Sequence, residues 1–108
     1  MSAPRDLAEV RMRIDELDSE VVRLLAQRQE LVRTAAGFKS DEQAVRAPDR
    51  VERVIAAVRD RAVTAGLAPE VAEAVWRAMI AAFIDLELHE HRRNTDMTAA
   101  DPVPHQEP

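Results

Sequence analysis

The sequence predicts an all-α fold built from three helices, of which the first is much the longest. The composition favours helix, because good helix formers such as Ala, Glu, Arg, Leu and Val dominate a chain with 46% hydrophobic residues, 32% charged residues and two glycines. Three segments repeat apolar residues at alternating steps of three and four, which is the spacing of one face of a helix. Prolines and glycines separate these segments and mark where helices start and stop.

The first helix is expected from Pro4 to Phe38. A helix of this length measures about 50 Å, which is more than the width of a 108-residue globule. Much of it must therefore pack against something other than its own chain, and a helical partner subunit is the expected cover. Its apolar positions are Leu7, Val10, Ile14, Leu17, Val21, Leu24, Leu31, Ala35 and Phe38.

Two shorter helices follow. The second is expected over 48–64, because Pro48 suits a first helical turn and Gly66 suits a C-terminal cap. The third is expected to start at Pro69 and to fade near Arg93. The remaining residues hold three prolines and no periodicity, so residues 1–93 are predicted to form one helical domain and residues 94–108 a disordered tail.

Composition also excludes several classes of protein. The chain has no cysteine, which excludes disulfides, a thiol nucleophile and a thiolate metal site. The net charge of −5 argues against a general nucleic-acid binder, and no apolar run reaches the length of a membrane span or of a signal peptide. His89 and His91 are two residues apart and lack the spacing of metal ligands on a helix. We expect a soluble cytoplasmic protein that binds neither nucleic acid nor a membrane.

Charged residues interrupt the apolar stripe of the first helix. Arg28 falls where the three-four pattern calls for an apolar residue, so it either forms a structural ion pair or waits for an anionic ligand. Lys39, the one lysine among 15 basic residues, lies about 16 Å further along nearly the same face. Taken alone, Lys39 is a solvated charge that favours the helix dipole, but its coincidence with Arg28 favours a shared anion site. Arg11 lies about 25 Å from Arg28, so it could serve the same small ligand only from a second subunit.

The third helix ends its apolar stripe in a charge as well. Glu87 follows Trp76, Ile80 and Phe83 at steps of four, three and four. Two readings stay open from the residues alone. Glu87 is either a boundary carboxylate that pairs with a cation such as Arg28, or a carboxyl group that reaches a ligand.

The combined pattern resembles a known family. The residues RxRIDELDxEVVRLLAQRQELV, then FK, a short loop, APDRV and a third amphipathic helix are similar to the small all-α (type II) chorismate mutases and to their relatives, the isochorismate pyruvate lyases. The resemblance covers roughly residues 5–93. It implies an intertwined homodimer with two active sites that each draw residues from both subunits, a substrate such as chorismate or isochorismate, and no metal or cofactor.

The resemblance also implies a role for each candidate site residue. Arg11 of the partner chain and Arg28 resemble the arginines that hold the substrate's two carboxylates. Lys39 resembles the cation that hydrogen-bonds the ether oxygen, and Arg50 resembles a further cation at the rim. Glu87 stands where many members have a glutamine that contacts the same oxygen. Lys39, Arg28 and Glu87 are thus the expected catalytic residues.

The chemistry of the family explains why a lysine and not an arginine would stand at position 39. Chorismate rearranges to prephenate by a pericyclic shift in which negative charge gathers on the ether oxygen. Arginines suit planar carboxylates, whereas a compact ammonium on a flexible stem suits a single oxygen atom. An ionised Glu87 would repel that charge, so we expect Glu87 to act in its protonated form.

The reaction itself stays open between relatives. Val51 follows Arg50 where family mutases often carry an acidic residue for the ring hydroxyl, and the FK, loop and APDRV also resemble the lyases. Chorismate mutase activity is favoured, with isochorismate pyruvate lyase activity, which yields salicylate, as the alternative and an aminated chorismate as another substrate. A non-catalytic helical dimer that binds a partner protein is a third reading. The pathway, whether aromatic amino acid biosynthesis or salicylate formation, does not follow from the sequence.

Overall fold

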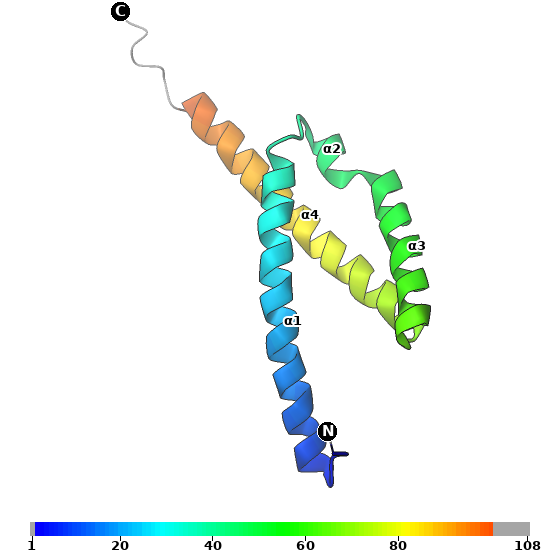
Figure 1. Cartoon of the computed structure of the whole chain (residues 1–108). Coiled ribbons are helices and arrows are strands. Elements are labelled where there is room, and N and C mark those ends of the chain that lie inside the picture. The colour runs from blue at the N-terminus through cyan, green and yellow to red at the C-terminus, as the bar shows by residue number, and fades with distance from the viewer. Residues whose placement is uncertain (1, 101–108) are drawn as a thin grey trace, which may run out of the picture. The chain divides into compact units, whose positions relative to one another are not determined.

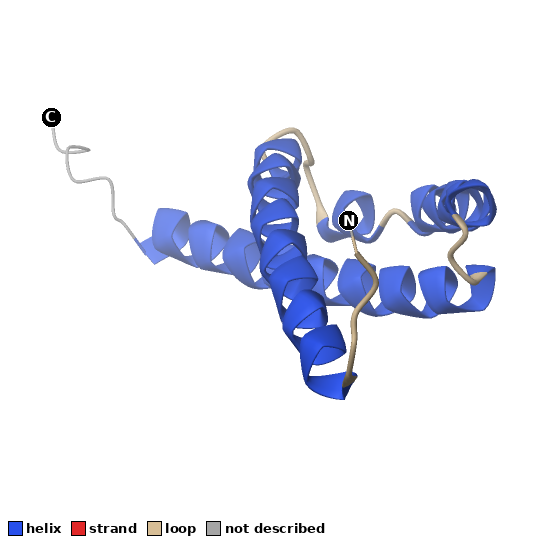
Figure 2. Ribbon diagram, turned by 60° about the horizontal axis from the view of Figure 1, so that its bottom comes forward, coloured by secondary structure: helices blue, strands red, loops and turns tan. Residues whose placement is uncertain are grey.

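A computed structural model describes residues 2–100 of the chain, with side chains up to Asn94. The described residues form four helices and no strand: α1 (Leu7–Ala36), α2 (Glu42–Arg46), α3 (Pro48–Ala65) and α4 (Pro69–Ala100) (Figures 1 and 2). The predicted all-α fold is therefore confirmed. The chain divides into two compact units, Met1–Thr34 and Ala35–Pro108.

The N-terminal unit consists mainly of α1. Asp6 caps this helix, because its side chain accepts a hydrogen bond of 2.9 Å from the backbone N–H of Glu9. No residue of α1 is buried. Large apolar side chains are exposed along its length, both in the apolar stripe and outside it, at Leu7, Val10, Met12, Ile14, Leu17, Val21, Val22, Leu24 and Leu31. Burying one such side chain stabilises a protein by roughly 1.5–3 kcal/mol, so α1 as described lacks the apolar cover that its sequence calls for.

In the C-terminal unit, the chain turns back after α3, and α4 packs against α3 (Figure 1). Gly66 makes the turn with φ of 84°, and its N–H donates to the carbonyl oxygens of Ala62 and Val63. This is the left-handed C-cap that the sequence predicts, because glycine adopts positive φ without a steric penalty.

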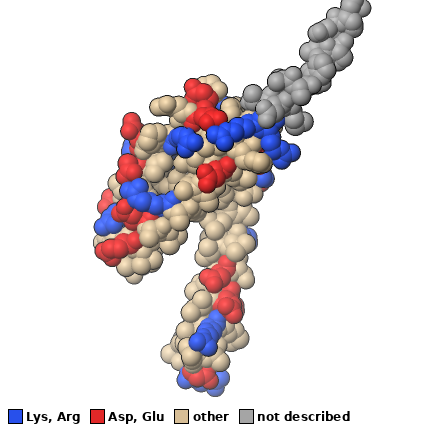
Figure 3. Space-filling view, turned by 180° about the vertical axis from the view of Figure 1, so that it is seen from behind, with Lys and Arg blue, Asp and Glu red and all other residues tan. Residues whose placement is uncertain are grey.

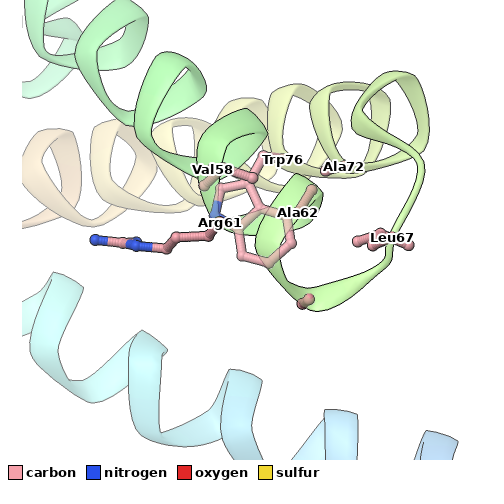
Figure 4. Close-up of a pocket in the computed structure, with 7 residues that line it drawn as sticks. Val58, Arg61, Ala62, Leu67, Ala72 and Trp76 are labelled. Atoms are coloured by element: carbon pink, nitrogen blue, oxygen red, sulfur yellow. The ribbon is translucent and has the colours of Figure 1, made fainter.

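A small apolar core lies next to this turn. Val58, Ala62 and Ala72 are buried together, and Val54 and Trp76 pack against them. Figure 4 shows the Trp76 indole lying across Ala62 at an apolar hollow, while the Arg61 side chain extends away from it. No side chain in the described residues is both large and fully buried, so this core is thin for a chain of this size.

Ion pairs on the surface also join α3 to α4. The Arg77 guanidinium donates to both carboxylate oxygens of Glu52, at 3.0 Å each, and to Glu73 at 2.7 Å. These hydrogen bonds from Arg77 hold the pKa values of Glu52 and Glu73 below the ordinary range. Acidic and basic side chains are interspersed on the face shown in Figure 3, so no large single-sign patch covers it.

The short helix α2 lies within the stretch that the sequence analysis assigns to a loop. Asp41 caps it by accepting a hydrogen bond of 2.8 Å from the Ala44 N–H. Val45 is buried, and α2 packs against α4. The helix ends at Arg46, and its C-cap is Ala47, which has φ of 35° and is the one non-glycine residue with positive φ in the described chain.

Helix boundaries otherwise follow the expectations closely, with one difference. α4 continues to Ala100, past the expected end near Arg93. Residues 101–108 of the predicted tail lie outside the described residues. None of the described helices combines the length and the apolar character needed to cross a lipid bilayer.

The backbone of Ala47 gives a stability prediction. A side chain with a Cβ in the left-handed region costs roughly 1–2 kcal/mol, and a β-branched side chain costs more. Ala47→Val should therefore lower the free energy of unfolding by about 1 kcal/mol or more, whereas Ala47→Gly should be tolerated. Chemical denaturation measures both.

Ala56→Val is the matched control, because Ala56 is an exposed residue in the interior of α3 and should lose only about 0.5 kcal/mol of helix propensity. Equal losses at positions 47 and 56 would show that the left-handed junction does not exist in solution.

Candidate active site

Two of the predicted site residues meet in the C-terminal unit. The Lys39 Nζ donates a hydrogen bond of 3.0 Å to Glu87 Oε2, between residues 48 positions apart in the chain. The side chain of Glu87 is 6% exposed and that of Lys39 is 26% exposed. The structure thus brings the lone lysine and the carboxyl group at the end of the α4 stripe into one ion pair.

Lys39 is placed by the way α1 ends. The last turn closes with hydrogen bonds from the N–H of Phe38 to the Ala35 oxygen, 3.0 Å, and from the N–H of Lys39 to the Ala36 oxygen, 3.1 Å. Asp41 then starts α2. Lys39 is therefore held between two helix ends, and its long stem carries the ammonium group to α4.

Glu87 is placed by the apolar face of α4. Its neighbours Ile80 and Leu88 are buried, and Phe83 and Ile84 are half-buried. Glu87 is the one buried polar or charged residue in the described part of the chain. A buried carboxylate needs a hydrogen-bonded cation, and Lys39 supplies it. Glu87 thus pairs with a cation, as the boundary reading of this residue predicts, and Lys39 is a cation that it meets.

The other three predicted residues lie on α3 and α1. Arg50 lies exposed in the first turn of α3. Arg11 is exposed and Arg28 is half-buried on α1, about 25 Å apart along that helix. A single copy of α1 therefore cannot bring Arg11 and Arg28 to one small molecule, as the sequence analysis expects, and their roles remain predictions.

The Lys39–Glu87 pair places an ammonium group beside a buried carboxyl group. One N–H of the ammonium group donates to Glu87, and the remaining N–H groups can donate to an anionic atom of a ligand. This pair offers electrostatic stabilisation and hydrogen bonding to a ligand oxygen.

Sequence reasoning missed a second contact next to this pair. Glu42 of α2 accepts two hydrogen bonds from Arg92 of α4, at 3.0 and 3.1 Å. Hydrogen bonds from Arg92 hold the pKa of Glu42 below its ordinary value, and the charges of Arg92, Arg46 and His91 act in the same direction. The signal for α2 was Asp41 at a cap position, with Glu42 in the first turn and Arg46 in the last. Nothing local pointed to Arg92.

The described residues contain no group of three or more His, Cys, Asp or Glu side chains arranged to hold a metal ion.

Comparison with known proteins agrees with the residue pattern. The family "Chorismate mutase type II" matches residues 10–88. Isochorismate pyruvate lyase of Pseudomonas aeruginosa is 38% identical to this chain over 58 residues, which are 51% of this chain and 57% of that protein. The chain therefore spans little more than half of the length of this relative. Because the family match covers well over half of the sequence and includes both the end of α1 and Glu87, the chain belongs to the chorismate mutase type II family.

Proposed function

We propose that the protein is a chorismate mutase, which rearranges chorismate to prephenate. The observation that carries this proposal is the Lys39–Glu87 pair, which sets a single ammonium group against a buried carboxyl group. Membership of a family named for this reaction supports it, and the family match is longer than the match to the lyase.

In the proposed reaction the ether carbon–oxygen bond breaks while a carbon–carbon bond forms within the same molecule. Negative charge gathers on the ether oxygen in the transition state. Lys39 donates a hydrogen bond to that oxygen, and a protonated Glu87 donates another. Preorganised donors of this kind stabilise a developing charge without reorganising at the moment of reaction.

The arginines would hold the substrate in its reactive conformer. Arg28 and Arg11 are proposed to bind the two carboxylates through paired hydrogen bonds, with Arg50 at the rim. Holding both ends of the molecule brings the two carbon atoms that must bond into contact, which lowers the entropic cost of the reaction.

We propose that this site is completed in a homodimer. The exposed apolar stripe of α1 needs cover, and a second copy of α1 is a partner of matching length and apolar character. The second copy would also supply Arg11, which cannot reach the ligand of Arg28 along its own helix.

Isochorismate pyruvate lyase activity is the second candidate. The similarity to isochorismate pyruvate lyase of Pseudomonas aeruginosa favours it. Val51 after Arg50 favours it as well, because an apolar side chain cannot hydrogen-bond a hydroxyl at the ring position that chorismate uses. The same cations would stabilise the ether oxygen as pyruvate leaves isochorismate.

Product analysis tests both candidates. Purified protein is given chorismate and isochorismate in parallel, and prephenate, salicylate and pyruvate are quantified. Prephenate from chorismate is the expected product, and Lys39→Ala should lower its kcat/KM by about a hundredfold or more, because a donor to the developing oxyanion is lost.

Lys39→Ala alone removes the cation that Lys39 places beside the buried Glu87 carboxylate, so this variant could lose activity by unfolding. A second variant separates loss of folding from loss of catalysis. Lys39→Ala combined with Glu87→Gln removes that charge, so it should stay folded and inactive. Salicylate and pyruvate with little prephenate would assign the lyase reaction instead. Wild-type protein that is inert on both substrates would favour the partner-binding reading.

Two substitutions test Glu87. Glu87→Gln keeps a hydrogen-bond donor and removes the negative charge, so it should retain most of kcat, whereas Glu87→Ala removes the donor and should lower kcat. Equal losses of kcat in the two variants would remove Glu87 from this role.

Mixing two inactive variants tests the shared site. Arg11→Ala and Lys39→Ala homodimers should both be inactive, but a mixed dimer contains one site with Arg11 and Lys39 both intact. Random subunit exchange makes half of the dimers mixed, so about a quarter of the wild-type activity should return. Mixed samples that stay as inactive as their components, despite exchange shown by native mass spectrometry, would place both residues in one chain's site.

A further inference from the structure

We propose that Arg92 is a positioning residue, which fixes α2 against α4 through Glu42 and thereby sets the place of the Lys39 ammonium. This inference rests on the proposed function only in its consequence for catalysis. The structural part concerns the C-terminal unit alone.

The contact has the geometry of a specific pair. Arg92 Nε lies 3.0 Å from Glu42 Oε2, and Arg92 Nη2 lies 3.1 Å from Glu42 Oε1. Two parallel hydrogen bonds fix the direction of both side chains, which a lysine at position 92 could not do. The pair therefore defines how the first turn of α2 sits on α4.

Lys39 lies immediately before this point. Two residues, Ser40 and Asp41, separate Lys39 from Glu42, and Asp41 caps α2. Glu87 and Arg92 lie five residues apart on α4, about 7.5 Å along its axis. The short segment from Lys39 to Glu42 is thus attached to α4 at both of its ends, once through Glu87 and once through Arg92.

Helix α2 needs such an attachment. A helix of five residues is too short to be stable alone in water, because nucleation is costly. Val45 of α2 is buried, α2 packs against α4, and the Glu42–Arg92 pair joins the two helices. Without the pair, α2 should detach from α4 more often. The Lys39 ammonium group should then spend less time next to Glu87.

The expected effect is modest, because both side chains of the pair are about half exposed, 58% for Arg92 and 43% for Glu42. A pair of this exposure shifts an equilibrium by about two- to fivefold. The loss should appear in kcat rather than in KM. The arginines of α1 that are proposed to bind the substrate's carboxylates are unchanged, and only the fraction of enzyme with Lys39 in place falls.

The experiment uses the full-length protein and its single lysine. Growth on ¹⁵N,¹³C-lysine labels one residue, so the side-chain ammonium group of Lys39 gives a single signal in the NMR spectrum. The variants are Glu42→Gln, Arg92→Gln and the charge swap Glu42→Arg with Arg92→Glu. Hydrogen exchange of the Val45 and Ala47 amides, which donate to the Asp41 and Gln43 oxygens, reports α2 itself.

The matched control is Glu52→Gln. Glu52 makes the same two-pronged contact with Arg77, between α3 and α4, away from Lys39 in the chain. It should leave the Lys39 signal, the two amides and kcat unchanged. Each single variant of the Glu42–Arg92 pair should make the lysine signal more mobile, speed exchange of both amides two- to fivefold and lower kcat by a similar factor. The charge swap should restore most of all three.

A Lys39 signal and α2 exchange rates in Glu42→Gln that match those in Glu52→Gln would overturn the proposal. So would a charge swap that restores nothing although each single variant has an effect. Wild-type protein without activity on chorismate or isochorismate would overturn the proposed function, and the lysine signal would still decide whether Arg92 positions the ammonium.

Discussion

The buried carboxyl group of Glu87 is the constraint on which the C-terminal unit depends. An isolated carboxylate on the apolar face of α4 would be costly, so its burial demands a cation at hydrogen-bond distance. Lys39 meets this demand, and in doing so it ties the segment after α1 to α4. The position of α2 follows from this contact, because α2 starts three residues after Lys39 and packs on the same helix.

Much of the fold could be predicted because its signals are local. The periodic apolar stripes gave the three long helices, while Pro48, Gly66 and Pro69 gave their ends within a few residues. Helix α2 could not be predicted in the same way. Five residues are too few for a periodic pattern, and α2 is held by burial of Val45 and by Arg92, which lies 50 positions from Glu42. Local sequence carries no record of such a contact.

In the candidate site, too, local sequence predicted which residues matter but not which of them meet. Lys39 and Glu87 could be singled out because each breaks or ends an apolar stripe, and the structure pairs them. Nothing in the periodicity said that Lys39 would meet Glu87, because the two residues lie 48 positions apart in the chain. The roles of Arg11, Arg28 and Arg50 remain predictions, since they depend on a substrate and on a second subunit as well as on this chain.

The length of α1 links stability to the proposed chemistry. A shorter helix could fold back within its own chain and bury its stripe, but it would then hold all of its arginines on one side of one subunit. A helix that runs about 45 Å leaves its stripe without cover in one chain and places Arg11 and Arg28 about 25 Å apart. Pairing with a second α1 would bury the stripe, and the same pairing would bring Arg11 of one copy to the Arg28 of the other. In the proposed dimer, the event that completes the core therefore also completes the site, so that a stable monomer of this sequence would lack a cation that the reaction requires.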